Sequence, residues 1–175
     1  MTIDTAIVTD FGHCLQHGEV ELISALNREG VRFMLIGGAA LILRGVRNLN
    51  DGIKDLDFLY SFDSTNCERV NRALTSFFAN NDSRFFAPSA REFSVPKRQY
   101  KTVYPLSDFL ATKTLEQFDC YEKSIDFVEI QFQQLPVASV PVLIDLKKEA
   151  VLAFDSELEK HSADLRALEA IIAGN

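Results

Sequence analysis

Tryptophan is absent from this chain of 175 residues, and proline and cysteine are scarce, with five and three copies. The three cysteines are widely spaced and form no Cys-x-x-Cys pair, which excludes a zinc site of that kind and predicts reduced thiols. No apolar run approaches the length of a membrane span, and no signal-peptide pattern opens the chain. We therefore expect a cytoplasmic protein without a membrane partner.

An excess of positive charge is also lacking, because 25 acidic residues outnumber 18 basic ones and give a net charge of −7. This balance argues against a broadly basic nucleic-acid binder. Apolar residues make up 47% of the chain, and 14 phenylalanines carry the aromatic packing. We expect one domain over residues 1–175, with a core at about 10–135 and a C-terminal helical part at about 139–173.

The most informative stretch is Val31–Tyr60, in which a strand, a glycine pair, a short helix, a polar loop and a second strand follow one another. The apolar run Phe33–Ile36 has the length of a strand, and Gly37 and Gly38 interrupt it before an apolar helical segment. Two adjacent glycines let the backbone approach a ligand closely, and a helix N-terminus attracts phosphate. The pattern predicts a phosphate-binding turn.

Two carboxylates, Asp55 and Asp57, lie two positions apart in the second strand. Side chains at i and i+2 of a strand point to the same face, about 6–7 Å apart. Such like charges repel each other, burial increases the repulsion, and a divalent cation relieves it. Because oxygen ligands suit magnesium, a phosphate cradle beside these acids indicates nucleotide–magnesium chemistry.

The remaining elements are predicted from helical spacing, strand alternation and turn residues. They are a loose lead-in at residues 1–9, a helix from about Glu19 closed by Gly30, a helix begun by a Thr65–Glu68 capping box, a third strand at Tyr100–Thr112, a strand at Ile125–Phe132, a helix capped by Ser139 that reaches about Phe154, and a final helix at Glu157–Ala173. Between them, residues 80–98 with Lys101 form the most basic stretch, which is either a solvated surface or a contact for a phosphate-bearing substrate.

The glycine pair Gly37-Gly38 followed by Asp55-Leu56-Asp57 resembles the signature of the DNA polymerase beta-like nucleotidyltransferase superfamily. More narrowly, the segments LIGGAAL, KDLDFL and NCERVNRAL resemble small prokaryotic nucleotidyltransferases of the minimal-nucleotidyltransferase and abortive-infection kind. The resemblance covers about residues 10–172. It implies an α+β nucleotidyltransferase fold, in which a small mixed sheet is flanked by helices and followed by C-terminal helices.

A site of this family needs a third carboxylate on a neighbouring strand. Spacing alone leaves four candidates, which are Asp108, Asp119, Asp126 and Glu129. The segment SDFLAT looks like the family's third-acid segment and favours Asp108 over Asp126. The resemblance then implies that Asp55, Asp57 and Asp108 are catalytic and hold two magnesium ions, for which manganese is a substitute.

The resemblance also implies a nucleotide-binding set. Gly37, Gly38 and the Ala39 amide would cradle the β- and γ-phosphates of a nucleoside triphosphate such as ATP. Lys54 directly precedes the acids, as a lysine often does in relatives. Lys147 would face the nucleotide, and the adjacent Lys148 is its rival for this role. Two departures from the family pattern leave Arg47 and Lys160 without an assigned role. The loop before the acids is longer here, and His161 replaces the first acid of a Lys-Asp-x-x-Asp-Leu segment.

The activity implied is transfer of a nucleoside monophosphate from the triphosphate to a hydroxyl of an acceptor. An RNA end, a protein side chain and a small hydroxylated molecule all remain open as acceptors. Similar proteins act in toxin–antitoxin and phage-defence systems, and the short chain favours a homodimer or a toxin–antitoxin partner. Two other hypotheses are a non-catalytic nucleotide-binding or regulatory module with the same fold, and an unrelated α/β phosphatase or hydrolase.

Overall fold

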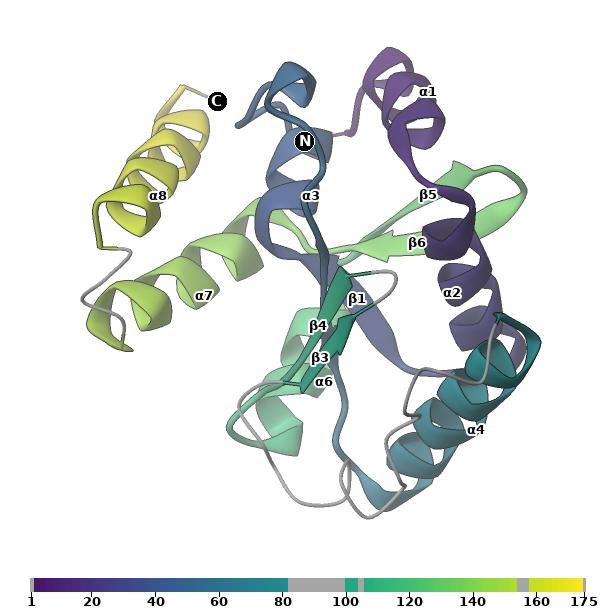
Figure 1. Ribbon diagram of the computed structural model, residues 1–175. Helices are drawn as coiled ribbons and strands as arrows, with labels where there is room; N and C mark the ends of the chain where they lie inside the picture. Colours follow the sequence, from purple (N-terminus) through teal and green to yellow (C-terminus); the bar gives the residue numbers. More distant parts are fainter. Residues whose placement is uncertain (1, 82–99, 104–105, 154–157, 175) are drawn as a thin grey trace.

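The computed structural model describes residues 2–81, 100–103, 106–153 and 158–174, and a mixed sheet forms its centre (Figure 1). The six strands lie in the order β3-β4-β2-β1-β6-β5. Neighbours β2 and β4 run parallel, as do β1 and β6, whereas the other pairs are antiparallel. The strands are β1 Phe33–Ile36, β2 Leu56–Tyr60, β3 Tyr100–Val103, β4 Leu106–Ala111, β5 Asp126–Ile130 and β6 Gln133–Val137.

Helices flank this sheet, which confirms the predicted α+β class with a small mixed sheet. Helices α2 and α4 lie together on one side of the molecule, and the C-terminal pair α7 and α8 lies on the other (Figure 1). The helices are α1 Thr5–Cys14, α2 His17–Arg28, α3 Gly37–Leu43, α4 Ser64–Asn81, α6 Leu115–Glu122, α7 Val140–Ala153 and α8 Leu158–Ala173, with a 3-10 turn at Leu49–Asp51. No helix in the described parts of the chain has both the length and the apolar character that crossing a membrane requires.

The core is built around the two central strands and supports the predicted strand–glycine–helix unit. Every residue of β1 is buried, and Phe58 of β2 packs with Phe33 and Phe109 at ring-centroid distances of 5.5 and 5.3 Å. Apolar burial of this kind is the main force that holds the sheet together. Helix α3 follows β1 without a loop and ends before Gly45, whose φ of +70° suits glycine.

The N-terminal part differs from its prediction, because helix α1 begins at Thr5, within residues 1–9, where a loose lead-in was expected. Asp4 caps this helix through a 2.8 Å hydrogen bond from the Ala6 N–H to its carboxylate, and Phe11 anchors the helix in the core. Helix α2 then begins at His17, earlier than the predicted Glu19. The helix ends near Gly30, as expected, and that glycine has a φ of +64°.

Three further predictions are corrected. Asp63, not Thr65, caps α4, since its carboxylate accepts a 2.9 Å hydrogen bond from the Asn66 N–H. The predicted strand at 100–112 is two antiparallel strands, β3 and β4, and the predicted strand at 125–132 ends at residue 130. Strand β6 and helix α6 were not predicted, whereas α7 and α8 were. Of the basic stretch, residues 82–99 lie outside the described residues.

Candidate active site

Two of the predicted carboxylates stand side by side on neighbouring strands. Asp57 of β2 is in register with Asp108 of β4, and the two strands run parallel. Residues in register on paired strands project from the same face of the sheet. Asp55 lies immediately before β2 rather than within it, two positions from Asp57. Asp108 is buried, whereas Asp55 and Asp57 are half-buried.

The rival acid Asp126 lies far across the sheet. It is in β5, an edge strand separated from β2 by β1 and β6. Its carboxylate forms a 2.6 Å ion pair with Arg44, whose side chain is 1% exposed and also donates hydrogen bonds to the carbonyls of Val137 and Ala138. Asp126 therefore neutralises a buried cation.

The glycine pair lies against the carboxylate of Asp57. Ile36 at the end of β1 is in register with Asp57, so the chain enters α3 directly beside this acid. Gly37 has a φ of +64°, and a Cβ atom at this position would overlap the Asp57 carboxylate. The Gly38 N–H donates a hydrogen bond to the same carboxylate. The site thus needs glycine at position 37 both for the backbone conformation and for space.

Burial and neighbouring negative charge perturb the titration of Asp57. Burial raises the pKa of Asp57 to about 7, and the negative charges of Asp55 and Asp108 add to this effect. The positive charge of Lys147 and the hydrogen bond from Gly38 act in the opposite direction. The three carboxylates therefore form an electrostatically unfavourable group that bound positive charge would stabilise.

A cavity of about 1120 Å³ opens over the carboxylates, and it is large enough for a nucleotide-sized ligand. Cationic side chains of the loop after α3 and of α7 and α8 contribute to its lining, together with apolar side chains such as Leu146 and Leu152. The lining includes every site residue predicted from the sequence, which are Gly37, Gly38, Ala39, Lys54, Asp55, Asp57, Asp108 and Lys147.

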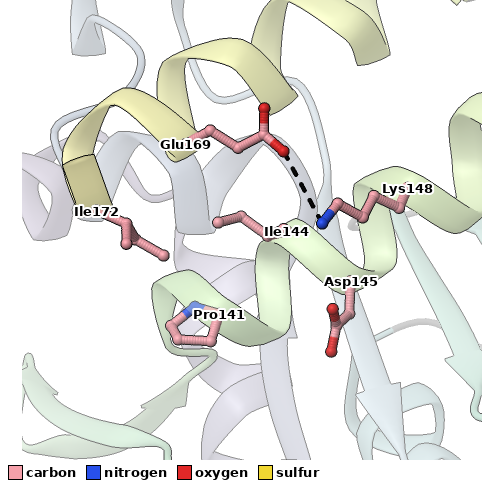
Figure 2. Close-up of a pocket in the computed structure, with 6 residues that line it drawn as sticks. All are labelled: Pro141, Ile144, Asp145, Lys148, Glu169 and Ile172. Atoms are coloured by element: carbon pink, nitrogen blue, oxygen red, sulfur yellow. Dashed lines mark ion pairs between the residues drawn. The ribbon is translucent and has the colours of Figure 1, made fainter.

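Lys148, the rival of Lys147, faces another part of the molecule. It points toward Glu169 of α8, at 3.9 Å, in a smaller hollow of about 280 Å³ between α7 and α8 (Figure 2). Lys147 instead lines the cavity and is buried. The geometry thus separates Lys147, which the family resemblance favoured, from the adjacent Lys148.

Two residues of this cavity region were missed from the sequence, and they bind each other. Arg47 donates two hydrogen bonds to the carboxylate of Asp164, of 2.9 and 2.7 Å, across 117 residues of sequence. Lys147 Nζ lies 2.7 Å from the same carboxylate and 3.3 Å from His161 Nδ1. Burial alone would raise the pKa of Asp164, but the hydrogen bonds from Arg47 and Lys147 lower it.

The donor chemistry of the site suits magnesium, although the side chains are not gathered around an ion. Carboxylate oxygens are the ligands that Mg²⁺ prefers, and Asp55, Asp57 and Asp108 supply them. Among the residues that the structure describes, no three His, Cys, Asp or Glu side chains form a group that could hold a metal ion as they stand. A bound cation would therefore require the carboxylates to adjust.

The comparison with solved structures agrees with this architecture. No protein-family model and no curated protein matches the sequence. In three dimensions the chain is similar to an antigenic nucleotidyltransferase-like protein from Paracoccidioides brasiliensis, with a TM-score of 0.53 and 16% identity over 88% of this chain and 75% of that one. At this identity the likeness concerns the fold alone. The chain therefore has a nucleotidyltransferase-like fold.

Proposed function

We propose that the protein is a magnesium-dependent nucleotidyltransferase that transfers a nucleoside monophosphate from a nucleoside triphosphate to a hydroxyl group of an acceptor. The observation that carries this proposal is the register of Asp57 with Asp108, directly beside Gly37 and within one large cavity. The carboxylates lie beside the turn at Gly37, where the backbone can approach a ligand closely, and cationic side chains line the same cavity. A magnesium–triphosphate complex has the complementary distribution of charge.

The carboxylates and the cations have different tasks in this proposal. Asp55, Asp57 and Asp108 are the residues that would hold two magnesium ions, or manganese in their place, and such ions stabilise the attacking and leaving oxygens of an in-line displacement. The backbone of Gly37, Gly38 and Ala39 lies against the β- and γ-phosphates. Lys147 and Lys54 neutralise negative charge on the triphosphate.

The reaction is a displacement at the α-phosphorus. The acceptor hydroxyl oxygen forms a new bond to this atom, and the bond from the α-phosphorus to the bridging oxygen breaks. Pyrophosphate leaves with the electron pair of that bond, and Asp108 accepts the hydroxyl proton. The product is the acceptor joined to the nucleoside through a phosphodiester, since the α-phosphorus keeps its bond to the nucleoside oxygen.

The proposal is tested by measuring magnesium-dependent release of pyrophosphate from each of the four ribonucleoside triphosphates. We expect release by the wild type and nearly complete loss in Asp57→Asn, because the variant removes a charge from the metal-binding group. Asp145→Asn is the matched control, since Asp145 is an exposed carboxylate of α7 that faces the smaller hollow. Normal turnover by Asp57→Asn would contradict the two-metal assignment.

The same assay sorts the acceptor classes. Total RNA is added in one series, hydroxylated small molecules in a second and cell protein in a third. An increase of pyrophosphate release in one series identifies an RNA end, a small molecule or a protein side chain as acceptor. A requirement for a second protein, encoded beside this one, would indicate a toxin–antitoxin partner, and concentration dependence of the specific activity would indicate a homodimer.

A second candidate function is a non-catalytic module that binds nucleotide. One observation favours it: in the described part of the chain the acids are not gathered into a group of three that could hold a metal ion. Tight binding of magnesium triphosphate, without release of pyrophosphate in any acceptor series, would select this function over the enzyme.

A further inference from the structure

Asp164 of helix α8 connects two cationic side chains from distant parts of the chain. Its side chain is 7% exposed, and its two oxygens bind Arg47, from the loop after α3, in a bidentate pair. One of these oxygens also pairs with Nζ of Lys147, from α7, at 2.7 Å. A carboxylate shared by two cations leaves one net positive charge at this point of the cavity wall.

Both cations lie close to the glycine pair and the acids. Arg47 Nη1 lies 3.2 Å from the position that a Cβ atom of Gly38 would occupy, so the guanidinium group stands beside the start of α3. Lys147 is near enough to the acids for its charge to lower the pKa of Asp57. Both side chains line the cavity, which places them where the phosphates of a bound triphosphate would pass.

Long cationic side chains lose much conformational freedom when they bind a ligand, and a fixed anchor removes most of that cost in advance. Arg47 is half-buried and Lys147 is buried, with side-chain exposures of 26% and 10%. Asp164 is their common partner. The contacts of Asp164 therefore hold the side chains of Arg47 and Lys147 in fixed orientations.

We propose that Asp164 is a positioning residue that holds Arg47 and Lys147 as the polyphosphate-binding wall of the cavity. This inference rests on the proposed function, because it assumes that the cavity takes a nucleoside triphosphate. It adds Arg47 to the binding residues and makes α8 part of the site, although α8 begins 101 residues after Asp57 of β2 in the sequence.

The test is a calorimetric titration of wild type and Asp164→Asn with three probes in magnesium buffer: inorganic tripolyphosphate, a nucleoside triphosphate and the matching nucleoside. We expect Asp164→Asn to bind tripolyphosphate and the triphosphate about tenfold more weakly, as one misplaced charge-assisted hydrogen bond would cause. Nucleoside binding should stay unchanged. A role in stability alone would weaken all three probes alike, and that result would overturn the inference.

A double-mutant cycle shows whether Asp164 acts through Arg47. If it does, Asp164→Asn should weaken binding of tripolyphosphate much less in an Arg47→Gln background than in the wild type. Glu169→Gln is the matched control, because it breaks an ion pair between the same two helices, to Lys148, outside the cavity. Equal effects of Asp164→Asn in both backgrounds, or tighter binding of tripolyphosphate by Asp164→Asn, would overturn the inference.

Failure of the inference is distinguishable from failure of the proposed function. If the wild type binds the triphosphate and Asp164→Asn binds it equally well, the inference is wrong and the proposed function stands. If the wild type binds no triphosphate, both are wrong. If Asp164→Asn does not fold, the single variants Arg47→Gln and Lys147→Gln decide, because normal tripolyphosphate binding by both would overturn the inference.

Discussion

At the scale of single residues, the site depends on how closely Gly37 approaches Asp57. The carboxylate occupies the space where any side chain at position 37 would begin, and the Gly38 N–H donates to it. The backbone therefore lies directly against one of the three acids that the proposed chemistry needs. This contact explains in physical terms why a glycine pair precedes the paired acids.

The Gly37–Asp57 contact gives a prediction that separates crowding from backbone strain. Gly37→Ala should destabilise the protein by more than Gly30→Ala, because both glycines have a φ of +64° but only Gly37 has heavy atoms within 4 Å of the added Cβ. The strain common to both costs about 1–2 kcal/mol. Unfolding in urea measures the difference, and equal losses in the two variants would contradict the contact.

At the scale of elements, local signals predicted those parts of the fold in which the sequence neighbours also interact. The unit β1–α3–β2, the end of α2 and both C-terminal helices follow from spacing and turn residues. The capping box of Thr65 misled because Asp63, two residues earlier, provides the carboxylate that accepts from Asn66. Strand β6 was missed because Pro136 argues against an internal strand, yet β6 pairs with both β1 and β5.

The start of α4 gives a prediction at this scale. Asp63→Ala should lower the free energy of unfolding by about 1–2 kcal/mol, because it removes the cap and the acceptor of the 2.7 Å hydrogen bond from the Ser61 hydroxyl. Thr65→Ala should change stability by less than about 0.5 kcal/mol, since Thr65 is exposed. Chemical denaturation of both variants measures these free energies of unfolding. A larger loss of stability in Thr65→Ala than in Asp63→Ala would show that Thr65, not Asp63, caps the helix.

At the scale of the whole molecule, the sheet order determines which acids can act together. Spacing alone left four candidates for the third acid, because it does not reveal which strands become neighbours, and the family resemblance favoured Asp108 over Asp126. The order of strands places Asp108 beside Asp57. It places Asp126 in the edge strand β5, where this acid forms an ion pair with Arg44. Arg47 and Asp164 escaped prediction for the same reason, since 117 residues separate them.

The two rival acids should therefore differ in what their loss affects. Asp126→Asn should destabilise the fold by about 1–2 kcal/mol, less than for a fully buried pair, because Asp126 remains half exposed beside Arg44. It should leave pyrophosphate release per folded molecule unchanged. Asp108→Asn should remove that activity at lower cost in stability than Arg44→Met. If Asp126→Asn lost activity while Asp108→Asn stayed active, Asp126 and not Asp108 would be the third carboxylate of the site.

The central claim is that Asp55, Asp57 and Asp108 form the metal-binding part of a triphosphate site beside Gly37 and Gly38. It is tested most directly by the anomalous diffraction of crystals grown with Mn²⁺ and a non-hydrolysable nucleoside triphosphate analogue. The account predicts anomalous peaks within coordination distance of these carboxylates, with phosphate density against the glycine pair and Arg47. Manganese and triphosphate bound elsewhere, or an empty cavity in the presence of both, would contradict it.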